Sequence, residues 1–325
     1  MSYKNIYILG VGGSGMSSIA KYLKQKGDNV IGYDQRKSYV TNLLNQDGIK
    51  VVHTLDEITY KPESLYIYSS AIPIESDRFE DFYDKENVLS RPEYLKNLSE
   101  NHKIIGITGT HGKTSTTALL SHIFHFNNVN VSYLYGGITT FNGIGGHYGD
   151  PDQPLILETD EAFNTFEKIK ISDLLVLNVD SDHLDYFKNL DNYKDAFYKV
   201  MKNVTDNLVI NNDDLNIKSM KELKNPVSYG KDISADFKVQ SPGNFIYENN
   251  KYEIKSDIIG DHFKSNMLGA IILALLNGIE IKDSLNAIES FAGVKRRIEL
   301  IGISKGVLIY DDYGHHPTEM EATIT

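Results

Sequence analysis

A glycine-rich segment near the middle of the chain places the strongest constraint on its fold. The segment reads GITGTHGKTSTT from Gly106 to Thr117 and continues an apolar run that begins at Ile104. In such a strand–loop–helix connection, the N–H groups of the loop approach an anion and the amino end of the helix adds partial positive charge. We therefore predict a phosphate-binding loop between a buried strand and a helix.

Individual residues of this loop indicate nucleotide chemistry. Gly109 and Gly112 let the backbone approach a phosphate closely. Lys113 supplies a full positive charge, and Thr114 can ligate Mg²⁺. The general GxxxxGK[ST] pattern would need its first glycine at position 107, so this loop is a compact variant. A tight turn without a ligand is the alternative, but it would not require the GKT sequence, and we expect ATP with Mg²⁺.

Composition limits the classes of protein that the chain can belong to. Its 325 residues suggest about two or three domains. With no cysteine, disulfides, thiolate zinc sites and cysteine nucleophiles are excluded. The net charge of −11 argues against a general nucleic-acid surface. No apolar run approaches the roughly 20 residues of a membrane span, and the start does not resemble a signal peptide, so we expect a cytoplasmic protein.

The first hundred residues alternate short apolar runs with helical spacing. Strands are predicted at 5–9, 29–33 and 64–68, with a helix at 14–24. A polar stretch from Leu95 to Lys103 then precedes the next strand, and we place the domain boundary near Asn101. The pattern is typical of a Rossmann-like domain with a parallel sheet, which we assign to residues 1–101.

The middle of the chain returns to the same kind of pattern. Apolar runs at 155–157, 174–179 and 207–210 predict strands, and the first two lack the polar alternation of a half-exposed sheet. Aromatic and polar residues alternate over 235–256, which predicts a small antiparallel addition. Helical spacing follows at 266–277. We predict an α/β fold overall, with a central P-loop ATPase-like domain over residues 102–304.

A second glycine motif lies near the N-terminus. Gly10, Gly12 and Gly15 form a GxGxxG pattern after the first predicted strand, and Asp34 ends the second. Alone, this pattern indicates NAD, with the acid on a ribose hydroxyl. A nucleotide-sugar pyrophosphate would require the same glycines, and a turn that only packs a helix on a strand is a third interpretation.

Acidic side chains and one histidine follow predicted strands of the central domain. Glu158, Asp160 and Glu161 come after the strand at 155–157, and His183 follows the strand at 174–179. Because the carboxyl ends of parallel strands meet at one edge of a sheet, these side chains are expected near the phosphate loop. Carboxylates there suit Mg²⁺, with a solvated acidic loop as the alternative.

Two polar clusters lie further along. GVKRRIE at 293–299 is basic within an acidic protein, and its arginines suit phosphate or carboxylate contacts, or else a surface ion-pair patch. The DDYGHHPTE segment holds Asp311, Asp312, His315 and His316, whose spacing could bind a metal. We favour a hinge between domains that also touches the nucleotide.

Together these segments resemble the Mur ligase family. Its motifs appear in family order across nearly the whole chain, as GVGGSGMS, SSAI, GTHGKTSTT, ETDE, DHLD, GVKRR and DDYGHHPTE. The resemblance implies an ATP-dependent ligase of peptidoglycan precursor synthesis that forms an acyl phosphate. It implies UDP-N-acetylmuramate and L-alanine as substrates, and it reassigns the first glycine turn from NAD to the UDP-sugar.

The resemblance also implies roles for individual residues. Lys113 would contact the ATP phosphates, and His111 would face the reacting carboxylate. Thr114 and Glu158 would bind one Mg²⁺ and His183 a second. The nucleotide site would comprise Gly109, Thr110, Gly112, Lys113, Thr114, Ser115, Asn266, Arg297 and Asp312. The UDP-sugar site would comprise Gly10, Gly12, Gly13, Ser14, Gly15, Met16, Asp34, Ser70 and Arg91.

Some positions depart from the family pattern. Where relatives read HNxxN, this chain has His262, Phe263 and then Asn266, which alters the expected contacts to adenine. A sibling enzyme attaches a recycled tripeptide to the same UDP-sugar, and DDYGHHPTE favours the L-alanine branch over it. A nicotinamide oxidoreductase, which would leave GTHGKT without a purpose, and a non-catalytic nucleotide-binding module are the alternatives from other classes.

The last segment predicts a strand at 307–312 and then a helix start at Pro317 and Thr318. Family members carry a third, C-terminal domain. We therefore expect residues 305–325 to be a hinge and the truncated start of that domain. On this expectation the chain binds the UDP-sugar, binds ATP weakly and ligates poorly.

Overall fold

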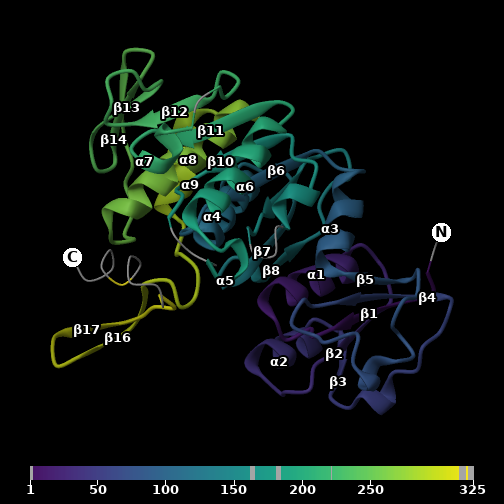
Figure 1. Ribbon diagram of the computed structural model, residues 1–325. Coiled ribbons are helices and arrows are strands. Elements are labelled where there is room, and N and C mark those ends of the chain that lie inside the picture. Colours follow the sequence, from purple (N-terminus) through teal and green to yellow (C-terminus); the bar gives the residue numbers. More distant parts are fainter. Residues whose placement is uncertain (1–2, 162–164, 181–183, 221, 315–319, 321–325) are drawn as a thin grey trace.

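The computed structural model shows two α/β units and a projecting arm (Figure 1). None of the described helices is long and apolar enough to cross a membrane. The predicted helix start at Pro317 and Thr318 lies outside the described residues, and so do His183, His315 and His316. The structure describes residues 3–161, 165–180, 184–220, 222–314 and 320.

The first unit is a five-stranded parallel sheet in the order β3-β2-β1-β4-β5. Its strands are β1 (Asn5–Leu9), β2 (Val30–Tyr33), β3 (Lys50–Val52), β4 (Ser64–Tyr68) and β5 (Val88–Ser90). Its helices are α1 (Ser14–Gln25), α2 (Tyr39–Gln46) and α3 (Arg91–Ser99). The predicted Rossmann-like parallel sheet is confirmed, with β1 and β4 at the predicted residues.

Local hydrogen bonds determine where α3 begins. The Ser90 side chain accepts from the Glu93 N–H, and the Glu93 carboxylate accepts from the Ser90 N–H at 2.7 Å. This reciprocal capping satisfies two N–H groups that the first turn leaves open, and Pro92 suits that turn. Arg91 is thereby placed at the first position of the helix, directly after β5.

The second unit is a ten-stranded sheet in the order β15-β14-β13-β12-β11-β10-β6-β9-β7-β8. Its strands are β6 (Ile104–Thr108), β7 (Ser132–Thr139), β8 (Gly143–His147), β9 (Leu155–Glu158), β10 (Asp173–Val176), β11 (Asn207–Asn211), β12 (Val227–Gly230), β13 (Phe237–Ser241), β14 (Asn244–Tyr247) and β15 (Asn250–Glu253). Its helices are α4 (Lys113–Phe126), α5 (Leu184–Phe187), α6 (Leu190–Lys202), α7 (Leu215–Lys218), α8 (Asp261–Leu276) and α9 (Ile281–Glu289).

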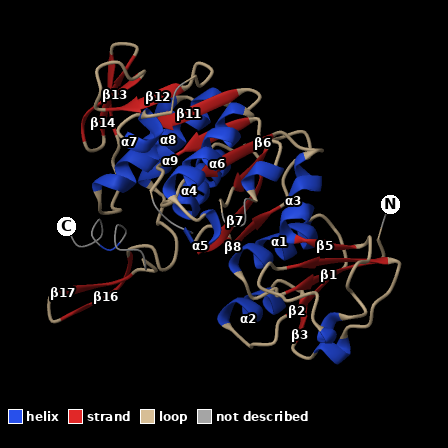
Figure 2. Ribbon diagram, in the orientation of Figure 1, coloured by secondary structure: helices blue, strands red, loops and turns tan. Residues whose placement is uncertain are grey.

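The middle strands of this sheet run parallel, while β13 to β15 and the β7–β8 pair are antiparallel. The antiparallel addition predicted within 235–256 is therefore confirmed. Strand β10 ends at Val176, three residues before the predicted end. The sequence reading did not anticipate the β7–β8 hairpin, which forms one edge of the sheet (Figure 2).

Helix α1 of the first unit packs on the β7–β8 hairpin of the second. Gly146 lies against the helix so closely that a Cβ there would collide with the Ser18 backbone. The Lys21 ammonium donates to the carbonyls of Asn142 and Ile144 at the hairpin. Apolar residues of both units share one buried cluster, so the two sheets are joined through a common core.

The arm is a two-stranded antiparallel hairpin of β16 (Glu299–Ser304) and β17 (Val307–Asp311). It extends away from both sheets (Figure 1). Its apolar side chains are largely exposed, with Leu300 at 51%, Ile303 at 67% and Leu308 at 50%. The strand predicted at 307–312 is confirmed as β17, and its partner strand was not foreseen.

Candidate active site

The predicted phosphate loop connects β6 to α4 at the edge where the parallel strands end. Gly109 and Gly112 have φ values of +145° and +83°, which favour glycine. A Cβ on Gly109 would lie 3.0 Å from the Leu177 Cβ, and one on Gly112 would collide with the Asn266 amide. Helix α4 starts without a side-chain cap or an acidic residue in its first turn. Its first N–H groups can therefore bind an anion.

Asn178, on the segment after β10, braces this loop. Its side-chain oxygen accepts from the His111 N–H at 2.8 Å, and its amide nitrogen donates to the His111 carbonyl at 3.0 Å. The Thr110 hydroxyl accepts from the Asp180 N–H at 2.8 Å. Asn178 was not predicted as a site residue, because position 178 was assigned to the interior of a strand. The polar residues of the NVDSD sequence that starts there indicate that the strand ends earlier.

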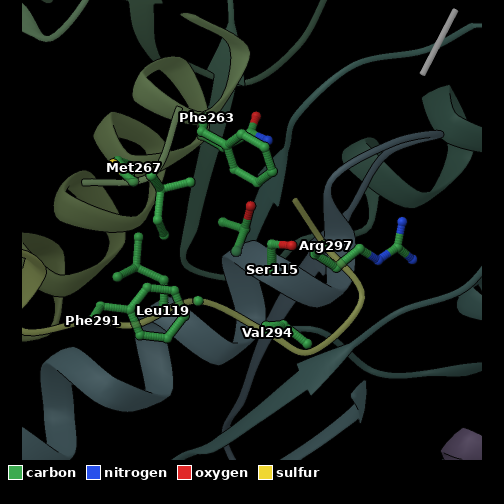
Figure 3. A pocket seen from close by; sticks show the side chains of 11 residues that line it. Ser115, Leu119, Phe263, Met267, Phe291, Val294 and Arg297 are labelled. Atoms are coloured by element: carbon green, nitrogen blue, oxygen red, sulfur yellow. The ribbon is translucent and has the colours of Figure 1, made fainter. Parts of the chain in front are cut away.

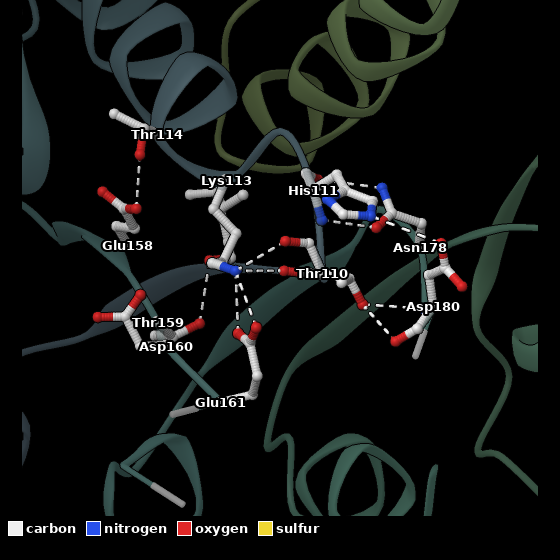
Figure 4. A network of polar contacts seen from close by, with 12 residues as sticks. Thr110, His111, Lys113, Thr114, Glu158, Thr159, Asp160, Glu161, Asn178 and Asp180 are labelled. Carbon is white, nitrogen blue, oxygen red and sulfur yellow. Dashed lines mark hydrogen bonds and ion pairs between the residues drawn. The ribbon is translucent and has the colours of Figure 1, made fainter. Parts of the chain in front are cut away.

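Lys113 is folded back over its own loop (Figure 4). Its ammonium donates to the carbonyls of Gly109 at 2.6 Å and Thr110 at 3.1 Å, and it lies 3.0 Å from a carboxylate oxygen of buried Glu161. Burial lowers the pKa of Lys113, but Glu161 and the neighbouring carboxylates outweigh it, so the pKa lies above its usual value. The lysine is therefore charged, and its ammonium is turned onto Glu161 and the loop carbonyls.

Thr114 and Glu158 meet beside the loop. The Thr114 hydroxyl donates to one Glu158 carboxylate oxygen at 2.7 Å, and the Gly136 N–H donates to the other at 2.6 Å. Burial, and next the nearby Asp160, raise the pKa of Glu158, although both hydrogen bonds act in the opposite direction. A cation would relieve this cost of a buried carboxylate.

These donors fit Mg²⁺, which prefers hydroxyl and carboxylate oxygens. Thr114 and Glu158 form a pair rather than a complete cage: within the described ranges, no three His, Asp or Glu side chains form a metal-binding group. Mg²⁺ commonly keeps several waters and takes substrate phosphates as ligands, so a protein pair suffices. His183, the predicted ligand of a second Mg²⁺, lies outside the described residues.

A cavity of about 540 Å³ opens beside the phosphate loop. It brings together residues from distant parts of the chain. Those predicted for the nucleotide or for catalysis that line it are His111, Gly112, Ser115, Asn266, Arg297 and Asp312. The predicted Gly109, Thr110 and Lys113 are not among its lining residues and lie in the loop behind it.

Phe263 forms part of the wall of this cavity, at the position where the resemblance predicts an asparagine. Its ring also borders a small apolar hollow with Leu119, Met267 and Phe291 (Figure 3). Arg297 extends away from the Phe263 ring in this view (Figure 3). An aromatic ring at this position offers a stacking surface and no hydrogen-bonding amide.

Asp312 and His111 are held by neighbours within the site. The Asp312 carboxylate accepts from the Ile298 N–H at 2.7 Å and the Gly314 N–H at 2.6 Å, which ties the arm to the preceding segment. The His111 ring nitrogen lies 3.6 Å from the Asp180 carboxylate (Figure 4). Both side chains still line the cavity beside the loop.

A second cavity, of about 700 Å³, lies between the two sheets. On one side it is lined by residues predicted for the UDP-sugar, namely Gly13, Ser14, Gly15, Met16, Ser70 and Arg91. On the other side lie Thr114, Gly136 and Glu158 of the second unit. The donors that fit the metal therefore face the cavity predicted for the sugar nucleotide.

Gly10, Gly12 and Asp34 do not line this cavity. The Asp34 carboxylate instead accepts from the Gly12 N–H at 2.8 Å and from the Arg36 N–H at 3.0 Å. Gly12 has no room for a side chain, because a Cβ would lie 2.6 Å from Asp34. Asp34 therefore holds the shape of the turn, and its contact to the UDP-sugar stays a prediction.

Two family models match the chain. The model described as "Mur ligase family, catalytic domain" matches residues 5–103, and "Mur ligase middle domain" matches residues 107–274. UDP-N-acetylmuramate–L-alanine ligase of Clostridium botulinum is 35% identical, over 99% of this chain and 73% of that protein.

Solved structures share the fold. UDP-N-acetylmuramate-alanine ligase from Thermotoga maritima aligns with a TM-score of 0.84 at 25% identity, over 98% of this chain and 76% of that one. UDP-N-acetylmuramate:L-alanyl-gamma-D-glutamyl-meso-diaminopimelate ligase from Neisseria meningitides aligns with a TM-score of 0.77 at 22% identity, over 91% of this chain and 100% of that one. Of these two structures, the Thermotoga ligase has both the higher TM-score and the higher sequence identity.

Proposed function

The chain belongs to the Mur ligase family, and we propose that it is an ATP-dependent ligase joining L-alanine to the carboxylate of UDP-N-acetylmuramate. One observation carries the proposal. At the start of α4, Gly112 and Ser115 face the cavity beside the loop, whereas Thr114 faces the cavity between the sheets. A triphosphate held at this turn would therefore end next to a substrate held by the first glycine turn.

ATP would occupy the cavity beside the loop. The N–H groups at the start of α4 and the Lys113 ammonium would hold the phosphates. Asn266 and Phe263 would contact the adenine, with Arg297 and Asp312 nearer the phosphates and ribose. The cavity of about 540 Å³ lies within the usual range for a small-molecule site.

UDP-N-acetylmuramate would occupy the cavity between the sheets. The N–H groups at the start of α1 and the Arg91 guanidinium would bind its diphosphate. The muramyl carboxylate would then point toward Thr114 and Glu158. Arg297 lines both cavities, so it can contact either substrate.

The proposed reaction has two steps. A muramyl carboxylate oxygen attacks the γ-phosphorus of ATP, the bond to the β-phosphate oxygen breaks, and an acyl phosphate and ADP result. The amino group of L-alanine then attacks the acyl carbon, inorganic phosphate leaves, and the amine gives up a proton. Positioning and charge neutralisation by Lys113 and the loop N–H groups do most of the work in such a transfer.

Mg²⁺ belongs to this proposal as the cofactor. Thr114 and Glu158 would hold it, and His183 is the predicted ligand of a second ion. When bound, it neutralises charge on the phosphate oxygens. Its binding would also favour the ionised form of Glu158, whose burial otherwise opposes ionisation.

Calorimetric titration tests the substrate assignment. We expect the chain to bind UDP-N-acetylmuramate and ATP·Mg²⁺ at separate sites and not to bind NAD. Binding of NAD, or NADH, in competition with UDP-N-acetylmuramate would instead favour the oxidoreductase interpretation of the first glycine turn.

The tripeptide-adding sibling is the second candidate, because the Neisseria structure with that name shares the fold. ADP release in the presence of UDP-N-acetylmuramate separates the two. L-alanine should stimulate it and L-Ala-γ-D-Glu-meso-diaminopimelate should not. The reverse preference would assign the chain to the sibling.

We also propose the domain division expected above. Residues 1–101 would bind the UDP-sugar, residues 102–304 would bind ATP, and residues 305–325 would form a hinge. The ends of the two family-model matches, at 103 and 107, support the first boundary.

A further inference from the structure

Arg91 forms an ion pair between the two units at the cavity between the sheets. It stands at the start of α3 in the first unit, and its Nη1 lies 2.9 Å from the Oδ2 of Asp160, which belongs to the second unit. The two side chains are 21% and 28% exposed, and both residues line the cavity between the sheets. Asp160 follows β9 two residues after Glu158, so the ion pair joins the first unit to the segment that would hold the metal.

The third glycine of the first turn makes room for this arginine. A Cβ on Gly15 would lie 2.9 Å from the Arg91 Nε and 3.1 Å from its Cζ. In dinucleotide-binding folds the third glycine serves the packing of helix against strand. Here it lets a guanidinium lie against the first turn of α1, where a bound diphosphate would be.

Asp160 does not satisfy the guanidinium completely. The Arg91 Nε is buried, and among the residues that the structure describes it has no hydrogen-bond acceptor. An arginine offers five N–H donors in a planar fork that matches phosphate oxygens well. A diphosphate at the start of α1 would be a stronger acceptor than the single contact that Asp160 supplies.

The first glycine turn also lacks a cation of its own. Residues 10–16 contain neither lysine nor arginine, whereas the phosphate loop carries Lys113. Lys295, Arg296 and Arg297 reach the cavity from the second unit. From the first unit, Arg91 is the basic residue among those that line it.

Resting on the proposed function, we propose that Asp160 is a positioning residue that competes with the substrate diphosphate for Arg91. Without substrate, Asp160 holds the guanidinium beside Gly15. When UDP-N-acetylmuramate binds, the guanidinium turns to the diphosphate and the ion pair with Asp160 breaks. Substrate binding at the first turn thereby releases the Asp160 carboxylate from Arg91.

The test is a double-mutant cycle read out as calorimetric affinity for UDP-N-acetylmuramate and for UDP. Asp160→Asn removes the competitor, so it should tighten binding of both ligands about three- to tenfold, the scale of a partly exposed ion pair. Arg91→Gln should weaken both. In the Arg91→Gln background, Asp160→Asn should change neither affinity by more than about twofold, because coupling requires both partners.

A matched control separates this competition from general charge repulsion. Asp152→Asn removes the same charge from an exposed turn of the same unit and should leave both affinities unchanged. Thermal unfolding of each variant verifies that it is folded, and the Asp160→Asn result alone is decisive where Arg91→Gln is unstable.

Three results would overturn the proposal. Asp160→Asn could leave both affinities unchanged or weaken them. It could tighten binding equally in the Arg91→Gln background. It could tighten binding of UDP-N-acetylmuramate but not of UDP. Failure of the unaltered chain to bind UDP-N-acetylmuramate at all would instead refute the proposed function.

Discussion

The two glycine turns of this molecule are built alike and charged differently. Each follows an interior parallel strand, β1 or β6, and opens a helix. Each is braced by a side chain that follows the neighbouring strand, Asp34 after β2 and Asn178 after β10. The second turn carries its own cation, Lys113, but the first receives its cation from α3. The glycine motif therefore predicts a phosphate site in both turns, but it does not show that the cation of the first turn comes from another element.

The largest effect is expected on ATP·Mg²⁺ affinity when Lys113, the cation of the second turn, is removed. In Lys113→Ala alone, the buried Glu161 carboxylate would lose the lysine's positive charge, at a cost of about 3–5 kcal/mol. We therefore combine it with Glu161→Gln. ATP·Mg²⁺ affinity should fall at least about 100-fold and acyl phosphate formation should stop, because the phosphates lose their charged donor.

UDP-N-acetylmuramate affinity, measured by the same titration, should stay within about twofold in this double variant, since the first turn uses a different cation. Glu161→Gln alone serves as the control. An equal loss of both ligands would show that the two turns are not charged independently.

The next largest effect is expected where α1 packs on the β7–β8 hairpin, since this contact holds the two turns in a fixed relative position. Gly146→Ala would drive a methyl group into the α1 backbone, which cannot move aside, so unfolding free energy should fall by about 1–3 kcal/mol. Affinities for both substrates should fall together. Gly302→Ala, with no atom within 4 Å of its Cβ, is the control and should be neutral in chemical denaturation.

Removing the side chain that braces each turn, Asp34 or Asn178, would test whether the two turns act independently. Asp34→Ala frees the first turn, and we expect about tenfold weaker UDP-N-acetylmuramate binding with unchanged ATP affinity. Asn178→Ala frees the second turn and should do the reverse. Calorimetry of both variants with both ligands checks this, and any pattern in which one variant weakens both ligands equally would contradict local bracing.

The smallest expected effect is a pH dependence of stability that comes from the helix after the second turn, α4, which buries a histidine. On α4, His122 donates from Nε2 to the Ala287 carbonyl at 3.1 Å, which leaves Nδ1 buried and unprotonated. Burial lowers the pKa of His122, so the unfolded chain binds the extra proton first. Stability should fall as the pH drops below the ordinary histidine pKa of about 6.5.

Thermal unfolding from pH 7.5 to pH 5 measures this loss, which should be smaller than that of the substitutions above. A His122→Asn variant should show a shallower dependence on pH. An identical pH profile in both proteins would exclude His122 as the source.

Much of the fold was predictable because local signals and burial agree. β1, β4 and β6 are short apolar runs, and β1 and β6 end in glycines that need unusual backbone angles, as Gly10 and Gly109 do. The β7–β8 hairpin was missed for the opposite reason. The alternation typical of a strand is broken by Gly136, Gly137 and Gly146. At each of these positions a side chain would crowd a neighbouring segment, such as the Ser18 backbone at Gly146.

The site divides in the same way. Lys113, Thr114 and Glu158 could be predicted to lie close together because each lies next to a strand end, where ligands gather in α/β folds, and the structure brings Thr114 and Glu158 into hydrogen-bond contact. Asp34 was predicted to contact the substrate, and that stays a prediction; its hydrogen bond to the Gly12 N–H, which holds the turn, was not foreseen. The meeting of Arg91 with Asp160 spans 69 positions and depends on how the two units pack, which no local pattern reports.

The β16–β17 arm has a practical consequence for handling the protein. Among the described residues these strands pair only with each other, so both outer edges offer free N–H and C=O groups beside exposed leucine and isoleucine. Ribbons of this kind add strands from other copies and drive aggregation. Concentrated samples should therefore oligomerise through the arm, and a lysine in place of Ile303 should keep them dispersed.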